Sequence, residues 1–211
     1  MWYKPKSCRT HEKKIRVVFY IYSMKYILSK KLFENQNWSP LLDLEDNVDY
    51  ELINIIESLL PNKGKILEIS CGNGADAIEL QEEGFSVTCT ENNQGYYDHV
   101  SQFVKCIKHD TRNKFPFADK SFDLVYSRLG LHYFSKEELS NIFSEIKRLS
   151  NYLVFSVKIE QDDINTGKVI LSKEDWEELV SENFNIISSE EKEGKLYNKE
   201  SKWLEIAASV I

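Results

Sequence analysis

A short apolar strand that runs into a glycine-containing turn and then a helix is the feature that most restricts this chain. Lys65–Ser70 (KILEIS) reads as the strand, Gly72 and Gly74 lie in the turn, and a helical stretch begins at Ala75. Another strand follows at 85–90. Strands that alternate with helices form parallel sheets with helices on both faces, because each parallel connection needs a crossover.

The alternation continues along the chain. Further strands are predicted over 104–109, 122–126 and 152–158, and helices over 48–60, 75–83, 95–103, 136–149 and 172–181. Two last strands, 184–190 and 203–210, are separated by polar residues 191–202, and a connection that short permits only an antiparallel hairpin. The sequence therefore predicts a doubly wound α/β fold, with a mostly parallel sheet that ends in an antiparallel hairpin.

The composition fits one soluble globular domain. The 211 residues are 42% hydrophobic, which suffices for a buried core. No apolar run approaches the roughly 18 residues that a membrane-spanning helix needs. The four cysteines form no CxxC pair and no disulfide framework, which predicts reduced thiols, a cytoplasmic protein and no bound metal.

The charge is unevenly distributed. The chain carries −7 overall, yet residues 1–31 hold nine Lys/Arg and one Glu, which gives +8 there and leaves −15 for the rest. The net negative charge disfavours general nucleic-acid binding. The basic stretch could be an arm that docks on an anionic surface or nucleic acid. The alternative is an unstructured extension, with Met24 as the native start.

Candidate ligand-binding residues lie at the ends of three successive predicted strands. Gly72 and Gly74 remove the side chains that would keep a ligand from the backbone after the first strand. Glu91 ends the second strand, where a carboxylate can accept hydrogen bonds from both ribose hydroxyls. Asp110 closes the third strand in the same manner. Together these residues predict a nucleoside-binding site at the carboxyl edge of the sheet.

Several stretches resemble the class I S-adenosylmethionine-dependent methyltransferases. Residues 66–80 (ILEISCGNGADAIEL) are similar to the family's glycine motif, LDLGCGTG, and residues 115–125 (FPFADKSFDLV) to its PFPDGSFDLV segment. Dinucleotide-binding dehydrogenases lack the second segment. Residues 129–134 (LGLHYF) and 145–149 (EIKRL) resemble the segments that come next. The resemblance implies a Rossmann-like methyltransferase fold with seven strands, and S-adenosyl-L-methionine as cofactor.

The resemblance also implies roles for the residues of the glycine motif. It places Ser70, Cys71, Gly72 and Gly74 along the methionine portion of the cofactor. Glu68 stands where the family usually has Asp, and it would hold the turn or reach the methionine amine. Ser70 stands where the family often has Gly, so we expect its backbone to avoid positive φ.

The other matching positions would contact the rest of the cofactor. Glu91 would bind the ribose, and Asp110 would bind the adenine amino group. Asn92 and Thr111 would flank the adenine ring. Ser127, at the end of the fourth strand, would lie beside the sulfonium.

Methyl transfer from a sulfonium needs chiefly an aligned acceptor and exclusion of water, so a general base is optional. His132 and Tyr133 follow the fourth strand, and either could take a proton from an O, N or S nucleophile. Packing or helix capping is the other interpretation of His132. No Asn/Asp-Pro-Pro-Tyr segment and no Pro-Cys pair is present, which disfavours methylation of DNA bases and favours a small-molecule acceptor.

We expect residues 1–47 to form a basic extension and residues 48–211 the cofactor-binding domain. The stretch 32–44, together with residues 129–134 after the fourth strand, is a candidate lid over the acceptor pocket, because an apolar cover must exclude water from the sulfonium. Its apolar side chains are Phe33, Trp38, Leu41 and Leu42. The competing interpretation makes Trp38 an anchor that packs this stretch onto the fold.

Two other functions stay open at the level of sequence. One is a non-catalytic methyltransferase-like binding domain. The other is a nicotinamide-dependent oxidoreductase, whose GxGxxG motif would here carry Ala77 at the third glycine. The sequence does not indicate an oligomeric state.

Overall fold

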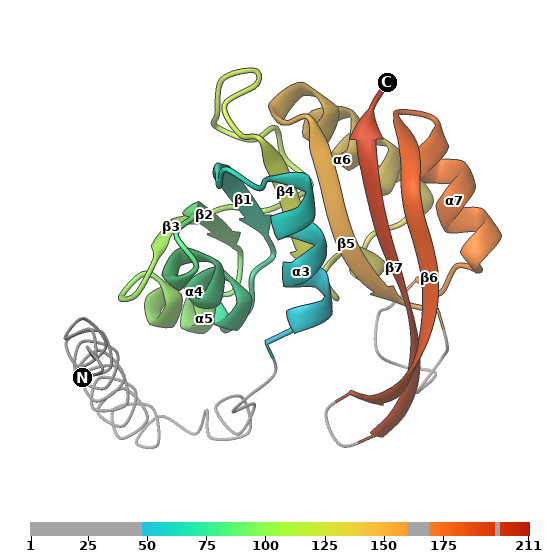
Figure 1. Ribbon diagram of the computed structural model, residues 1–211, viewed down its shortest axis with the longest axis horizontal. Helices are drawn as coiled ribbons and strands as arrows, with labels where there is room; N and C mark the ends of the chain where they lie inside the picture. Colours follow the sequence, from blue (N-terminus) through green and yellow to red (C-terminus); the bar gives the residue numbers. More distant parts are fainter. Residues whose placement is uncertain (1–47, 160–168, 197–198) are drawn as a thin grey trace, which may run out of the picture. The chain divides into compact units, whose positions relative to one another are not determined.

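One seven-stranded sheet, ordered β3-β2-β1-β4-β5-β7-β6, organises the computed structural model of the protein (Figure 1). The structure describes residues 48–159, 169–196 and 199–211, within a unit that spans Asp46–Ile211. The strands are β1 (Lys65–Ile69), β2 (Ser86–Glu91), β3 (Lys105–Lys108), β4 (Leu124–Arg128), β5 (Tyr152–Lys158), β6 (Phe184–Leu196) and β7 (Lys199–Val210). The first five strands pair in parallel, and β7 is antiparallel to both β5 and β6. The predicted fold class is confirmed.

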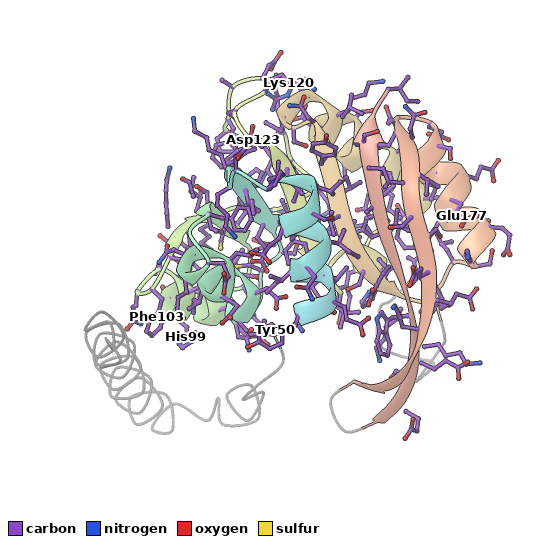
Figure 2. All side chains as sticks on the ribbon, viewed as in Figure 1. Tyr50, His99, Phe103, Lys120, Asp123 and Glu177 are labelled. Carbon is purple, nitrogen blue, oxygen red and sulfur yellow. The ribbon has the colours of Figure 1, made fainter. Side chains whose placement is uncertain are left out.

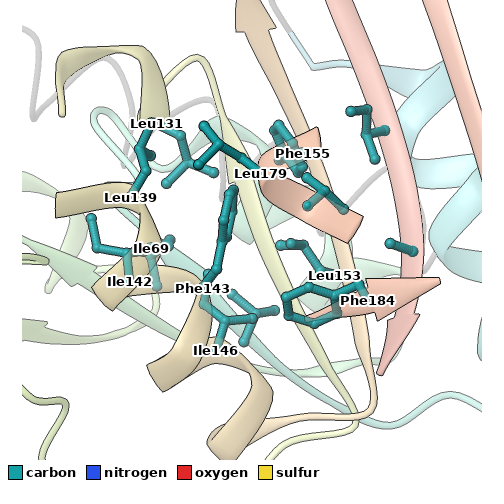
Figure 3. Packing of buried hydrophobic residues seen from close by; sticks show 14 of the residues in the cluster. Ile69, Leu131, Leu139, Ile142, Phe143, Ile146, Leu153, Phe155, Leu179 and Phe184 are labelled. Atoms are coloured by element: carbon teal, nitrogen blue, oxygen red, sulfur yellow. The ribbon is translucent and has the colours of Figure 1, made fainter. Parts of the chain in front are cut away.

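Helices cover both faces of this sheet. They are α3 (Tyr50–Leu59), α4 (Ala75–Glu82), α5 (Gln94–Val100), α6 (Lys136–Leu149) and α7 (Lys173–Ser181), with a 3-10 turn, η1 (Leu131–Tyr133). Apolar residues of α3, α4 and α5 share one buried cluster with the sheet, and those of α6 and α7 share the other. In Figure 3, Phe143 of α6 lies within the second cluster, and its ring centre is 6.0 Å from that of Phe155 in β5.

The helices on the α6 side begin at residues that can cap them. The Ser135 hydroxyl accepts a hydrogen bond from the N–H of Glu138, and the Glu138 carboxylate accepts one from the N–H of Ser135. Ser172 and Asp175 form the same reciprocal box at the start of α7. Such boxes satisfy backbone donors that the first helical turn leaves unpaired, which fixes where each helix starts.

The closing hairpin is longer than predicted. Residues 191–202 were expected to connect two short strands, but β6 and β7 stay paired through Glu193 opposite Lys202 and Gly194 opposite Ser201. This pairing runs past the end of β5, which stops opposite Trp203. The prediction of a polar connection was wrong because backbone pairing extends the two strands through residues that are mostly polar, so the side chains here carry no apolar strand pattern.

Different residues lie at the two ends of the strands. Asp123 lies at the edge where the strands begin, and its Oδ2 accepts a hydrogen bond from the N–H of Lys65 at 2.8 Å (Figure 2). Tyr50 lies at the opposite edge, where α3 starts (Figure 2). The candidate ligand residues follow the carboxyl ends of β1, β2, β3 and β4. The predicted basic arm (1–31) and lid (32–44) fall outside the described residues.

Candidate functional site

The turn that joins β1 to α4 is held by backbone hydrogen bonds and by two left-handed glycines. The N–H of Cys71 donates to the carbonyl of Thr90 at 3.2 Å, and the N–H of Gly74 donates to the carbonyl of Cys71 at 2.9 Å. Gly72 and Gly74 have φ values of +56° and +75°, which favour glycine. A Cβ on Gly74 would lie 2.9 Å from both methyl carbons of Val100, whereas a Cβ on Gly72 would meet nothing within 4 Å. The turn thus has open space beside Gly72, where a ligand can approach the backbone.

Glu91 is the last residue of β2, and its side chain holds this turn in place by hydrogen bonds. Its Oε2 accepts a hydrogen bond from the N–H of Gly72 at 2.9 Å, and its Oε1 accepts one from the N–H of Asn93 at 2.7 Å. Only 8% of the residue is exposed. The carboxylate is therefore oriented before any ligand arrives.

Ser70 adopts the conformation that the sequence led us to exclude. Its φ is +55°, in the left-handed region, so the expectation of a negative φ was wrong. The Ser70 Oγ lies 3.1 Å from the Oγ1 of Thr111, which provides a hydrogen bond that a glycine could not make. Gly130 gives room to the serine, because a Cβ on Gly130 would come within 3.0 Å of the Ser70 Cβ. The tertiary surroundings therefore impose a backbone conformation that local preference opposes.

Asp110, which follows β3, is held by its neighbours. Arg112 binds both oxygens of the Asp110 carboxylate, with Nε 2.9 Å from Oδ1 and Nη2 2.8 Å from Oδ2. Hydrogen bonding to Arg112 lowers the pKa of Asp110, so this carboxyl group is anionic at neutral pH. The side-chain amide of Asn92 reaches Asp110 Oδ2 at a longer 3.4 Å. The structure thus brings the predicted residues Asn92 and Asp110 together.

Glu68 lies inside the sheet rather than in the turn. It pairs with Cys89 of β2 and Tyr126 of β4 in the strand register, and 2% of it is exposed. Burial, and then the nearby Asp76 carboxylate, raise the pKa of Glu68 well above its usual range. Its Oε2 has no hydrogen-bond partner among the described residues. We therefore expect Glu68 to be protonated at moderate pH.

Asp76 is a functional candidate that the sequence interpretation missed. This α4 residue is 2% exposed, and its Oδ2 accepts from the Tyr126 hydroxyl at 2.9 Å and lies 2.6 Å from Nε of Arg128. Its Oδ1 accepts from the N–H of Asp49, which caps α3. Asp76 thus links the start of α3, the start of α4 and the end of β4. The only sequence signal was an acidic residue in the first turn of a helix.

The remaining predicted cofactor residues are buried. Ser127 is fully buried at the end of β4, and its hydroxyl donates to the carbonyl of Ile69 at 3.2 Å. Cys71 and Cys89 are buried in the cluster that α3, α4 and α5 cover, and Cys106 packs against it. A hydrogen bond with Cys71, followed by burial, raises the pKa of Cys106. Thiols with raised pKa values are poor nucleophiles, which agrees with packing as the role of these cysteines.

His132 and Tyr133 lie side by side in η1 but in different environments. Their ring centres are 4.6 Å apart. His132 is 1% exposed and its Nδ1 accepts from the N–H of Lys158 at 3.4 Å, whereas Tyr133 is 53% exposed. Because Nδ1 is the acceptor, the neutral imidazole carries its proton on Nε2. His132 can therefore donate a hydrogen bond more readily than accept a proton.

The described ranges hold neither a cluster of metal-ligating side chains nor a membrane-spanning helix. Residues 48–159, 169–196 and 199–211 contain no group of three or more His, Cys, Asp or Glu that could hold a metal ion. Within the same part of the chain, no helix is long and apolar enough to cross a membrane.

Comparison with known proteins identifies the domain. Residues 66–151, which include the glycine turn, Glu91, Asp110 and η1, match the family model described as a methyltransferase domain. This stretch is a methyltransferase domain. The Bacillus subtilis protein YqeM, which carries a provisional methyltransferase name, is 36% identical over 76 residues. That match covers 33% of this chain and 30% of YqeM, so the chain aligns with less than a third of this relative.

Solved structures share the fold of the methyltransferase domain. An S-adenosylmethionine-dependent methyltransferase from Methanosarcina mazei aligns with a TM-score of 0.65 and 19% identity, over 74% of this chain and 97% of that one. The N-methyltransferase NodS from Bradyrhizobium japonicum, solved with S-adenosyl-L-homocysteine, aligns with a TM-score of 0.62 and 15% identity, over 78% of this chain and 89% of that one. At these identities the likeness concerns the fold alone.

Proposed function

We propose that this protein is an S-adenosyl-L-methionine-dependent methyltransferase whose acceptor is a small molecule with an O, N or S nucleophile. The observation that carries the proposal is the pair of oriented carboxylates, Glu91 and Asp110, which follow adjacent strands beside an open glycine turn. Class I methyltransferases place the cofactor at this edge of the sheet. The matched domain supports this proposal over the nicotinamide-dependent alternative.

The hydrogen-bonding capacity of the two carboxylates fits a nucleoside. A carboxylate has about four acceptor sites. Glu91 uses two of them on backbone N–H groups, which leaves two for ribose hydroxyls. Asp110 holds Asn92 only through a 3.4 Å contact, so an adenine amino group can replace that amide. Both carboxylates can therefore bind the nucleoside without losing the contacts that orient them.

The residues of this chain would align the cofactor with the acceptor and exclude water from the sulfonium. The cofactor, when bound, brings a methyl group that is already activated on a sulfonium. Gly72 would let the methionine portion lie against the backbone, and Ser127 would stay below it as a buried hydroxyl. Such positioning can provide much of the rate enhancement of a methyl transfer.

We assign different tasks to the two predicted catalytic residues. The exposed Tyr133 hydroxyl would exchange a proton with an acceptor that binds beside η1. His132 is 1% exposed, so it would position η1 and Tyr133 rather than touch the acceptor, and its Nδ1 accepts from the Lys158 N–H. The O, N or S identity of the nucleophile then depends on the acceptor rather than on a single strong base.

Calorimetry and mass spectrometry test the proposal. The full chain should bind S-adenosylmethionine and S-adenosylhomocysteine, and incubation with a metabolite extract and labelled cofactor should yield a methylated product. Glu91→Ala should abolish both signals, whereas Glu178→Ala, an exposed change on α7, should preserve them. Binding without any product would favour the non-catalytic alternative, and absence of binding would refute the proposal.

A further inference from the structure

The Ser70–Thr111 hydrogen bond joins two loops whose strands are not neighbours. Ser70 follows β1 and Thr111 lies shortly after β3, and β2 separates these strands in the sheet. Their hydroxyl oxygens are nevertheless 3.1 Å apart. The bond therefore spans the end of β2, beside the edge at which the cofactor would bind.

The chain keeps a serine at this position although its backbone favours glycine. Ser70 has a φ of +55°, and left-handed residues other than glycine are strained. The loop after β4 is adapted to the serine as well. A Cβ on Gly130 would come within 2.8 Å of the Ser127 Oγ and within 3.0 Å of the Ser70 Cβ. A glycine at position 70 would remove the strain, but it would also remove the hydroxyl that bonds to Thr111.

We propose that Ser70 and Thr111 form a positioning pair. Their hydrogen bond would set the distance between the glycine turn after β1 and the loop after β3, which would bind the adenine, before the cofactor binds. This inference rests on the proposed function. A ligand with a nucleoside and an amino-acid tail would touch both loops, whereas adenosine lacks the tail that would lie along the glycine turn. If the two loops are already at the distance that the ligand needs, they lose less conformational entropy when it binds. The affinity for a ligand that spans both loops is then higher.

Calorimetry on a double-mutant cycle tests the pair. Ser70→Ala and Thr111→Val should each weaken S-adenosylhomocysteine binding about fivefold, the factor that corresponds to one net hydrogen bond of about 1 kcal/mol. The double variant should bind no worse than either single variant, because both remove the same bond. Adenosine binding should change less than twofold in all three. Thr111→Ser, which keeps the hydroxyl, should restore wild-type affinity.

A second comparison separates the strain from the hydroxyl. Ser70→Gly and Ser70→Ala both lack the hydroxyl, but only the alanine keeps the strained backbone. The glycine variant should melt about 2–4 °C above the alanine variant, as expected for about 1 kcal/mol in a domain of this size. The two should bind S-adenosylhomocysteine equally weakly. Ser58→Ala, which removes an exposed hydroxyl on α3, should alter neither property.

The outcomes distinguish this inference from the proposed function. A wild-type chain that binds no S-adenosylhomocysteine refutes the function itself. Where the wild type binds, additive losses in the double variant, or equal losses for adenosine and S-adenosylhomocysteine, refute the positioning pair alone.

Discussion

Glu91 accepts a hydrogen bond from the backbone N–H of Gly72 at 2.9 Å, so the carboxylate that ends β2 holds the turn that follows β1. One side chain therefore links the two segments between which the ribose would lie. A second bond, from the N–H of Asn93 to the other carboxylate oxygen, fixes the orientation of the side chain.

Glu91→Ala should weaken S-adenosylhomocysteine binding at least about 100-fold. In the proposed binding mode, the variant would lose two charge-assisted hydrogen bonds to the ribose, each worth roughly 1.5–3 kcal/mol. It also releases the N–H of Gly72. Calorimetry gives the affinity directly, with Glu178→Ala as the control. An affinity within threefold of wild type would remove Glu91 from the site.

Asp76→Asn should lower the free energy of unfolding by about 3 kcal/mol, because it leaves the Arg128 guanidinium without its charged partner in a largely buried position. Urea unfolding followed by fluorescence measures this change. Lys136→Ala breaks an exposed ion pair with Asp175 and should leave the midpoint nearly unchanged. Equal effects of the two variants would show that the Asp76 network adds nothing to stability.

Glu68 should make stability fall as pH rises. Its pKa is raised above the ordinary value of 4.5 in the folded chain, chiefly by burial, so the folded state binds more protons than the unfolded state. The stabilisation is complete below the ordinary value and is lost as pH rises through the raised one. Glu68→Gln, which cannot ionise, should flatten this decline at pH values above the ordinary 4.5. Urea midpoints across that range provide the measurement, and parallel curves for both proteins would contradict the expectation.

His132→Gln should retain turnover within about tenfold of wild type, since loss of an essential general base costs 10²–10⁴-fold. The reason is the hydrogen bond from the N–H of Lys158, which leaves Nε2 as a donor. Glutamine can still donate at a similar place. Rates measured from pH 6 to pH 9 should show the same acidic limb in both proteins, and a limb that disappears with His132 would assign it the role of base.

The sequence predicted most of the sheet well because residues on both faces of β1, β2, β4 and β5 are buried. Such strands read as apolar runs between helices of clear periodicity, as β1 and β5 do. The far part of the β6–β7 hairpin lacks that signal. Glu190 pairs with Glu205 and Glu193 with Lys202, and this polar composition resembles that of a loop.

The sequence predicted which residues lie near the strand ends, but it did not predict the geometry of the candidate site. Gly72, Glu91 and Asp110 stand at strand ends, which spacing alone can reveal. The φ of Ser70 could not be foreseen, because Thr111, 41 residues away, provides the compensating bond. Asp76 was missed for the same reason, since Asp49, Tyr126 and Arg128 come from distant parts of the chain.

The exposed side of β6 has a consequence for behaviour at high protein concentration. An edge strand offers unpaired backbone groups that can recruit a strand from another molecule. Here four consecutive charged residues, Glu190–Glu193, occupy the edge, and Glu190 and Glu193 are well exposed. A second copy added in register would place like charges against one another and strip them of water. The charges that made this strand hard to recognise also protect the molecule from fibrillar self-association.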